Sequence, residues 1–396
     1  MLNRRHTLSA LSALYAGGVL GLLGLPAAAA SPPAPKPPPG KPAPDKSGKW
    51  PDWDTFQKQF VSDGGRVIDT GSLRSQTFSE GQSYALFFAL VANDQTNFEK
   101  ILRWTEDNLC QGDMTAHLPA WLWGRRDDDT WGVLDTNSAS DSDLWIAYAL
   151  GEAGRLWDNR RYRLLANLLI ARILREETAS LPGLGLCLLP APKGFELQPG
   201  RWRLNPSYMP MHLMVWLATY QTDPRWKEIA ETSLKVTLKS APKGFVPDWI
   251  LYEADKGFLP DLEGAEKGQG AYNAIRTYLW AGVLHTAAPA RPVLLKALAP
   301  MGAFVKKNGY PPESVDILTG QAAQPGSTGF SAAVLPFLQA LGDKSSVREQ
   351  LDRIEARPLL PTQYYAQVLS LFGRGWMDGV YRFNKNGQLQ TQWKLK

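Results

Sequence analysis

The chain has 396 residues and a formal net charge of +5, a sign of charge that would suit nucleic acid or a membrane surface as partner. The first fifty residues hold six basic residues and one acidic residue, so the remainder holds 37 of each sign. The folded part is therefore formally neutral. This argues against a nucleic-acid or polyphosphate partner, because such partners need a basic stripe.

The first thirty residues predict a signal peptide. Arg4 and Arg5 precede an apolar run over residues 8–25, and small residues occupy positions 27–30. This order is typical of an export signal cleaved near Ala30, so we expect a periplasmic or secreted protein. The paired arginines leave the general and the twin-arginine export routes both open. A membrane anchor is the alternative, but the run is short and contains four glycines, so we expect no stable membrane span.

Residues 31–49 are rich in proline and predict an extended linker that buries no apolar surface. The remaining residues, 50–396, contain no second low-complexity segment. We therefore expect them to fold as one domain, although it would be a large one.

Apolar residues recur at positions i, i+3, i+4 and i+7 in many segments of this domain, which indicates helices. The clearest segments are residues 84–91, 146–153, 213–220 and 365–372. Stretches rich in glycine, proline and tryptophan separate them, at residues 118–124, 181–207, 241–260 and 308–330. We expect an all-α fold, a toroid of helical hairpins whose long loops carry the functional residues.

Several kinds of chemistry lack a sequence signature. The chain has no His-x-x-x-His or Cys-x-x-Cys pair, no glycine-rich nucleotide loop and no Gly-x-Ser-x-Gly motif. We therefore expect neither a metal nor a cofactor. The two cysteines, Cys110 and Cys187, fit either one disulfide or two buried thiols.

Carboxylates, amides and aromatic rings remain as candidate functional groups. The chain has 15 tryptophans, 13 tyrosines and 14 phenylalanines, more rings than we expect a core to need. Aromatic rings line many binding clefts, and in carbohydrate clefts they pack against the axial C–H face of a sugar. The composition therefore favours a polysaccharide ligand.

Two acidic motifs lie where helices are expected to begin. The first, SEGQSY at residues 79–84, has Ser79 placed to cap a helix and Glu80 in its first turn. The second, NSASDSDLW at residues 137–145, places Asp141 and Asp143 at the next helix start. An acidic residue in either motif could simply cap a helix or complement its dipole, so neither motif alone proves catalysis.

Taken together, the two motifs resemble those of glycoside hydrolase family 8, in particular the endoglucanases that accompany bacterial cellulose synthases. The resemblance extends from about Trp53 to Trp376. Further matching segments are PAWLWG at 119–124, NPSY at 205–208, APKGF at 241–245, KNGYPP at 307–312 and GFSAA at 329–333. Ser142 departs from the family pattern, in which a glycine or alanine is usual.

This resemblance implies an (α/α)6 barrel whose long loops form a substrate cleft, so that residues 50–396 would be a family 8 catalytic domain. It also implies an endo-β-1,4-glucanase, a cellulase that hydrolyses cellulose or a soluble β-glucan with inversion. β-1,4-Glucan chains would be its substrate. The cellulose synthase export machinery is a partner that the resemblance suggests.

An inverting mechanism needs a protonated acid and a base roughly 6.5–9.5 Å apart, with the base activating water on the opposite face of the sugar. By resemblance, Glu80 is the proton donor. Asp141 matches a family aspartate near the −1 sugar, which acts as a nucleophile or, better suited to inversion, stabilises the distorted ring.

The position of the usual general base departs from the family. The family's Tyr-Asp-Ala-x-Arg segment is here YNAIR at residues 272–276, so an amide, Asn273, replaces the aspartate. An amide cannot accept the proton of water as a carboxylate does. Another carboxylate is then the base, or Asn273 only positions water in a slow enzyme, or the protein binds glucan without cleaving it. The candidate replacement bases are Asp141, Glu253, Asp255, Asp261, Glu263 and Glu266.

Arg276 and Tyr272 keep the identities that the family has at these positions, so we expect them to contact sugar or to hold the cleft. The other aromatic candidates, which would either stack on sugars or pack in the core, are Tyr84, Trp121, Trp123, Trp145, Tyr208, Trp249 and Tyr310. Chitosan or xylan is an alternative substrate, but a formally neutral domain disfavours the polycationic chitosan.

Overall fold

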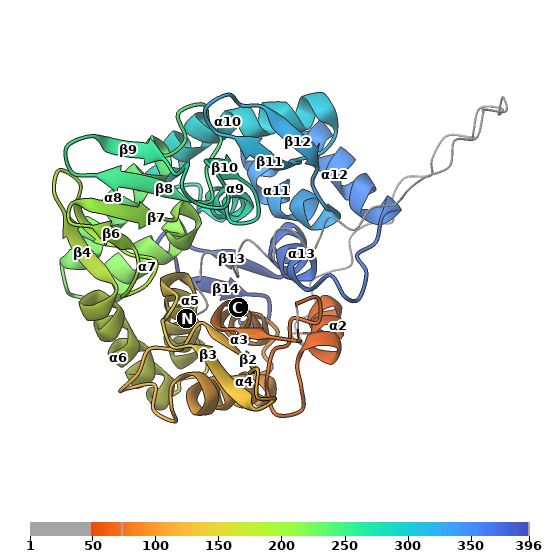
Figure 1. Ribbon diagram of the computed structural model, residues 1–396. Helices are drawn as coiled ribbons and strands as arrows, with labels where there is room; N and C mark the ends of the chain where they lie inside the picture. Colours follow the sequence, from red (N-terminus) through yellow and green to blue (C-terminus); the bar gives the residue numbers. More distant parts are fainter. Residues whose placement is uncertain (1–48, 73, 395–396) are drawn as a thin grey trace, which may run out of the picture.

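The computed structural model describes residues 49–72 and 74–394. Twelve α-helices in this part of the chain follow one another around a ring, and the last, α13, packs against the first, α2 (Figure 1). Alternate helices form the inner ring: α3 (Ser79–Val91), α5 (Ser140–Leu156), α7 (Met211–Tyr220), α9 (Ala274–Val283), α11 (Thr328–Ala340) and α13 (Tyr364–Met377). Their outer partners are α4 (Gln95–Leu109), α6 (Arg160–Glu176), α8 (Arg225–Lys239), α10 (Ala290–Asn308), α12 (Lys344–Ala356) and α2 (Pro51–Phe60). The expected (α/α)6 barrel is thus confirmed.

Inner and outer helices differ in how much of their surface is buried. Every residue of α3 except Glu80 is buried, and so is every residue of α5 except Arg155. The outer helix α6 instead buries a single apolar stripe, which runs from Tyr162 to Leu174. Helices α3 and α5 therefore have core on all sides, so a charged residue on either of them needs a specific partner.

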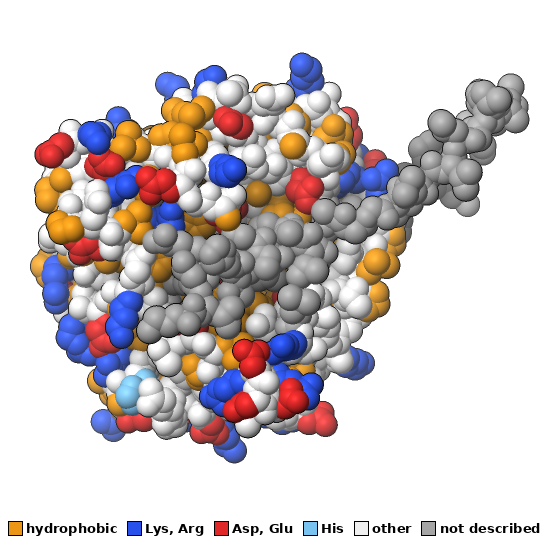
Figure 2. Space-filling model, viewed as in Figure 1, with side chains coloured by type: hydrophobic (Ala, Val, Ile, Leu, Met, Phe, Trp, Pro, Cys, Tyr) orange, Lys and Arg blue, Asp and Glu red, His pale blue; other side chains and the backbone are white. Residues whose placement is uncertain are grey.

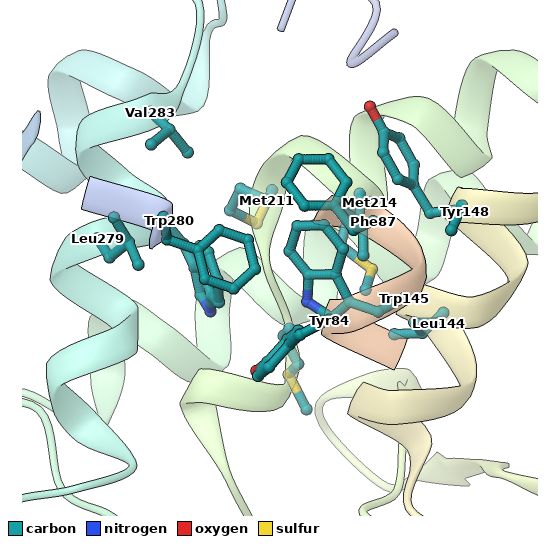
Figure 3. Close-up of a cluster of buried hydrophobic side chains, with 14 of the residues drawn as sticks. Tyr84, Phe87, Leu144, Trp145, Tyr148, Met211, Met214, Leu279, Trp280 and Val283 are labelled. Atoms are coloured by element: carbon teal, nitrogen blue, oxygen red, sulfur yellow. The ribbon is translucent and has the colours of Figure 1, made fainter. Parts of the chain in front are cut away.

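Aromatic side chains fill the centre of the inner ring (Figure 3). Trp145 of α5 packs against Tyr84, Phe87 and Trp280, with ring centroids 5.8, 5.0 and 5.4 Å away. Only 1% of its surface is exposed. The expectation that Trp145 stacks on a sugar is therefore corrected, because a ring enclosed by other core rings offers no face to a substrate.

Among the described residues, the segments between the helices, expected as long loops, and the segment after α13 contain fourteen short β-strands in five antiparallel sheets. The strands are β1 (Thr77–Phe78), β2 (Leu122–Arg125), β3 (Trp131–Asp135), β4 (Thr178–Leu181), β5 (Gly185–Leu188), β6 (Glu196–Gln198), β7 (Arg201–Leu204), β8 (Ile250–Glu253), β9 (Gly257–Pro260), β10 (Gln269–Gly270), β11 (Pro312–Asp316), β12 (Ala322–Pro325), β13 (Tyr381–Phe383) and β14 (Leu389–Thr391). Strand β1 leads directly into α3, and β10 lies just before α9. These two strands fix the starts of both helices.

The β13–β14 hairpin packs against the inner helices α5 and α7. The fully buried carboxylate of Glu152, in α5, accepts hydrogen bonds from the backbone N–H of Leu389 at 2.7 Å and from Trp216 Nε1 at 2.8 Å. Tyr148 donates to the carbonyl oxygen of Gly387 at 2.8 Å. The C-terminal part of the described chain therefore completes the surroundings of a charged group inside the barrel.

Both cysteines, Cys110 and Cys187, are buried and unbonded, so the alternative of two thiols is confirmed. Burial raises the pKa of the Cys187 thiol to about 12, which keeps it protonated at neutral pH. Across residues 49–72 and 74–394, no group of three or more His, Cys, Asp or Glu side chains is placed to hold a metal ion.

The surface carries both signs of charge. Lysine, arginine, aspartate and glutamate side chains are intermixed on the face shown in Figure 2, which is consistent with the formal neutrality of residues 51–396. None of the helices in the described residues is long and apolar enough to cross a bilayer. The predicted signal peptide and the linker up to residue 48 lie outside the described residues.

Candidate active site

Arg276 is the centre of a buried polar cluster. It lies in the first turn of α9, and its side chain is only 4% exposed. It donates hydrogen bonds to Tyr84 Oη at 2.9 Å, to Ser207 Oγ at 3.0 Å and to Asn273 Oδ1 at 2.7 Å. Tyr84 comes from α3 and Ser207 from the 3-10 helix η1 (Pro206–Tyr208). The cluster therefore joins segments far apart in the sequence.

Two carboxylates share one nitrogen of this arginine. Arg276 Nη1 forms ion pairs with Asp141 Oδ2, at 3.3 Å, and with Glu80 Oε1. The two carboxylates therefore face the same guanidinium nitrogen. Because Asp141 is held against Arg276 in this way, it is better placed to stabilise charge than to activate a water as the replacement base.

Glu80 is the only residue of α3 that is not buried, and its side chain is 29% exposed. It accepts a hydrogen bond from Tyr84 Oη at 3.2 Å. The expectation that Ser79 caps the helix is wrong: Phe78 is the N-cap residue, without a side-chain cap, and Ser79 is already helical. The N–H of Ser79 donates instead to the carbonyl of Trp121 at 3.0 Å, so the β1–β2 pairing holds this helix start.

Asp141 lies in the first turn of α5 and does not cap it. The N-cap residue is Ala139, without a side-chain cap, so the alternative of an aspartate cap is excluded. One oxygen of Asp141 accepts the N–H of Ser142 at 2.8 Å, and the other faces Arg276. Asp141 is thus fixed inside the cluster, where a negative charge would stabilise a cationic sugar ring.

Asn273 is the N-cap residue of α9. Its Oδ1 accepts the hydrogen bond from Arg276, and its backbone N–H donates to Asp248 Oδ1 at 3.1 Å. With Oδ1 engaged by the guanidinium, the other polar atom of the amide is the donor Nδ2. This donor can orient a water or a sugar hydroxyl but cannot accept a proton.

Asp248 belongs to the site, although sequence analysis did not identify it. The residue is 1% exposed, and its Oδ1 accepts the N–H groups of Ala271, Asn273 and Ala274 at 2.8, 3.1 and 2.7 Å. Burial raises the pKa of Asp248 to about 7, against the opposite effect of these hydrogen bonds. No local motif could reveal it, because its partners lie 23 to 26 residues further along the chain.

Three of the candidate replacement bases are held in ion pairs. Arg201 binds Glu253 and Glu263, with N–O distances of 3.1 and 2.7 Å. Arg203 donates to Asp261 at 2.9 Å, and both residues are buried. Arg201 and Arg203 of β7 therefore hold these three carboxylates in place.

The other two candidates, Asp255 and Glu266, differ in their surroundings. Asp255 is exposed in the turn between β8 and β9. Glu266 is half-buried in the segment before β10, and its charge adds to the effect of burial on the pKa of Asp248. Glu266 is therefore the loop acid whose charge acts on Asp248, the residue that accepts the backbone N–H of Asn273.

Two of the expected stacking residues, Tyr208 and Trp249, form a cluster with Phe195 beside Arg276. The ring of Trp249 stacks on Phe195 with centroids 5.7 Å apart and lies 6.0 Å from Tyr208. The guanidinium carbon of Arg276 is 5.7 Å from the Tyr208 ring centroid. The structure thus brings this pair of aromatic candidates to the polar cluster.

Tyr272 and Tyr310 have separate surroundings. Tyr272 Oη donates to Glu313 Oε1 at 2.6 Å, and the carbonyl of Tyr272 accepts from Tyr365 Oη at 2.5 Å. Tyr310 is half-buried and packs on Phe304, near the end of α10, with centroids 6.2 Å apart. The structure fixes Tyr272 beside Asn273, whereas it gives Tyr310 a packing contact.

Trp121 and Trp123 lie on the segment that pairs with β1. Trp121 packs on Phe78 with ring centroids 5.9 Å apart. Trp123 is opposite Thr77 in the β1–β2 register and stacks on Trp131 at 5.3 Å. Both rings are therefore positioned along the strand that leads to Glu80.

An (α/α)6 barrel that brings the acid Glu80 to a polar cluster around Arg276, at the starts of its inner helices, suits a glycoside hydrolase. The family model of glycosyl hydrolases family 8 matches residues 43–379. The chain belongs to this family and is an enzyme.

Individual relatives cover most of the chain. An endoglucanase of Salmonella typhi is 46% identical over 345 residues, which are 87% of this chain and 91% of the relative. An endoglucanase of Xanthomonas axonopodis pv. citri (strain 306) is 43% identical over 357 residues, 89% of this chain and 91% of the relative.

Solved structures give the same result. The endo-1,4-D-glucanase from Vibrio fischeri ES114 has a TM-score of 0.84 at 45% identity, covering 87% of this chain and 99% of that chain. The endo-beta-1,4-glucanase CMCax from Acetobacter xylinum has a TM-score of 0.69 at 26% identity, covering 84% and 98%.

Proposed function

We propose that the protein is an endo-β-1,4-glucanase that cleaves internal bonds of cellulose or a soluble β-glucan with inversion at the anomeric carbon. The position of Glu80 carries the proposal: it is the one unburied residue of α3 and lies beside Tyr84 and Arg276. An acid at this position can protonate the leaving glycosidic oxygen. Relatives named endoglucanase over most of the chain support catalysis rather than binding alone.

In this proposal, several residues bind the sugar chain. Trp249 would stack on a glucose unit next to the polar cluster, and Trp123 would do so beside Glu80, with the buried rings of Tyr208 and Trp121 packed near them. Arg276 would hold Asp141 against the −1 sugar. These assignments follow from the ring contacts and ion pairs around the two helix starts.

A product assay tests the proposed function. Carboxymethylcellulose should lose viscosity faster than it gains reducing ends, because an endo-acting enzyme cuts within chains. Cello-oligosaccharides followed by proton NMR should first give the α-anomer, the product of inversion at a β-linkage. Release of the β-anomer first would contradict the inverting mechanism, and no release from any β-glucan would contradict the enzyme.

We propose Glu266 as the general base that compensates for Asn273. It is the loop acid whose charge acts on Asp248, and Asp248 is bonded to the backbone of Asn273. Arg201 and Arg203 hold Glu253, Glu263 and Asp261, and no contact of these three acids with Asp248 or Asn273 is part of this proposal. In this proposal, the Glu266 side chain moves toward the attacking water that the Asn273 amide orients, and so supplies the carboxylate that the usual aspartate provides in the family.

Substitution separates Glu266 from its neighbours. Glu266→Gln should lower kcat by about 10²–10⁴-fold, because general-base assistance is lost while the shape is kept. Glu263→Gln, in the same loop but paired with Arg201, is the matched control and should leave kcat within a few-fold of wild type. Equal kcat values for the two variants would rule out Glu266.

We further propose that the enzyme acts in the periplasm or outside the cell, alongside cellulose synthesis and its export machinery. The basic, apolar and small-residue order of residues 1–30 supports export. Fractionation of cells that express the full chain tests this location. Activity confined to the cytoplasm would contradict it.

A further inference from the structure

The first turn of α9 is capped by a residue from another segment. The N–H groups that begin a helix have no partner within it and need an acceptor. Asn273, the N-cap residue, makes no side-chain cap. Oδ1 of Asp248 takes this role and accepts three N–H groups of the segment from Ala271 to Ala274.

The segment that carries Asp248 is itself bound closely to the start of α9. The N–H of Asp248 donates to the carbonyl of Gln269 at 2.9 Å, and the N–H of Val246 donates to Tyr278 Oη at 3.0 Å. Between these bonds, a Cβ on Gly270 would overlap the carbonyl oxygen of Val246. The two segments are therefore in contact along their length, and Asp248 is not free to shift.

Asp248 has site residues on both sides. The turn that it caps carries Tyr272 and Asn273 and leads to Arg276, which binds both carboxylates of the cluster. The next residue in sequence, Trp249, stacks on Phe195 in the aromatic cluster. Asp248 thus lies between the aromatic cluster that contains Trp249 and the turn that carries Asn273.

We propose that Asp248 is a positioning residue, which sets the place of Asn273 and Arg276 relative to Glu80 and to the sugar held by Trp249. This inference rests on the proposed function, because it concerns the rate of the same reaction. A displacement of about 1 Å in such groups can cost a factor of about 10² in rate.

Hydrogen bonding, rather than charge, is what this position requires. All three N–H groups engage Oδ1, whereas the buried Oδ2 has no hydrogen-bond partner among the described residues. Asparagine offers the same acceptor oxygen. The titratable groups around Asp248 are Glu266, Tyr278 and Tyr365, and the pKa of Asp248 is raised to about 7 by burial. A neutral side chain is thus accommodated at this site.

Kinetics of two variants test the proposal. Asp248→Ala should lower kcat on carboxymethylcellulose by about 10–100-fold with a smaller change in KM, because bound substrate meets displaced groups. Asp248→Asn should stay within about threefold of wild type, because its amide oxygen still caps the turn.

A cap elsewhere in the barrel provides the matched control. Asp343 caps the outer helix α12 and accepts the N–H of Ser346 at 3.2 Å and its hydroxyl at 2.9 Å. Asp343→Ala should lose stability, since a lost N-cap costs about 1 kcal/mol, but keep the wild-type kcat.

Hydrogen exchange gives a readout that does not depend on activity. The amides of residues 271–276 should exchange at least tenfold faster in Asp248→Ala and at the wild-type rate in Asp248→Asn. If Asp248→Ala does not fold, Asp248→Ser can replace it in the test. The shorter serine hydroxyl cannot reach all three N–H groups, so both effects should appear, but to a smaller degree than in Asp248→Ala.

Two results would overturn the proposal. One is wild-type kcat and wild-type exchange in a folded Asp248→Ala. The other is an Asp248→Asn as inactive as Asp248→Ala, which would make Asp248 a proton acceptor. A wild type inert on every β-glucan would instead contradict the proposed function, and exchange at residues 271–276 would still decide the role of Asp248.

Discussion

The starts of α3 and α9 both contribute to the candidate active site, yet they are built in opposite ways. Helix α3 begins without a side-chain cap, and the N–H of Ser79 donates to the carbonyl of Trp121, a residue distant in the sequence that lies next to β2. The start of α9 is capped by the side chain of Asp248, which lies more than twenty residues earlier in the sequence. Both sides of the site therefore depend on contacts distant in the sequence, but a backbone carbonyl holds the acid side, whereas a buried carboxylate holds the opposite side.

Gln82 shows how the motif of α3 includes its own support. Its buried side chain accepts the N–H of Val67 at 2.6 Å and donates to Thr105 Oγ1 at 2.9 Å and to the carbonyl of Gly65 at 3.2 Å. A short motif thus contains Glu80 and the residue that fixes its helix. At the start of α9 the supporting side chain, Asp248, instead lies outside the YNAIR segment.

The largest expected effect is on the α3 side. Glu80→Gln keeps the shape of the side chain but cannot donate the proton, so kcat should fall by about 10²–10⁴-fold or more. Cello-oligosaccharide binding, measured by calorimetry, should be nearly unchanged. Activity within a few-fold of wild type would remove the acid assignment and, with it, the contrast between the two helix starts.

A smaller effect is expected at the start of α9. With Glu266 as base, Asn273→Asp should change kcat by less than about tenfold, because a second carboxylate would compete for the same water. If the enzyme had no base at all, the same change should raise kcat by about 10²–10⁴-fold. A wild type inert on soluble β-glucans and revived by Asn273→Asp would therefore contradict the displaced base.

The smallest effect concerns stability and pH. The pKa of Asp248 is about 7 in the folded protein, against an ordinary value of 3.8 for an aspartate, so the folded form holds its proton more tightly than the unfolded chain does. This stabilisation is complete below about pH 4 and is lost as pH rises through 7. The free energy of unfolding of wild type, relative to Asp248→Asn, should therefore fall by on the order of 1–2 kcal/mol between pH 5 and 7.

Urea unfolding at several pH values measures this difference, because asparagine at position 248 does not titrate. A relative stability that rises with pH would mean that the start of α9 favours the ionised carboxylate more than burial opposes it.

The helices could be predicted from sequence because their apolar patterns are local. Residues 84–91 and 146–153, identified by their spacing, lie inside α3 and α5. The short strands could not be predicted in the same way. Strand β7, for example, pairs with β8, and Trp202 lies opposite Tyr252, so the pairing depends on segments about fifty residues apart.

For the candidate site as well, the sequence predicted what depends on short motifs and missed what depends on distant contacts. Motif resemblance identified Glu80, Asp141 and Arg276, which the fold brings into contact. Helical spacing could not separate a cleft residue from a core residue on an inner helix, where all sides are buried, and Trp145 was misassigned for this reason. Asp248 was missed because its role exists only after the fold has brought two loops together.

The β13–β14 hairpin has a consequence for the order in which the molecule can form. The buried carboxylate of Glu152, in α5, is bonded to the backbone of Leu389, more than two hundred residues later. During synthesis, α5 leaves the ribosome long before this partner exists. Arg155 of the same helix pairs with Glu152, but a buried carboxylate that lacks one of its hydrogen bonds is still costly. We therefore expect the barrel to close only after residues 381–391 have been made, so that the growing chain stays open until translation is nearly complete.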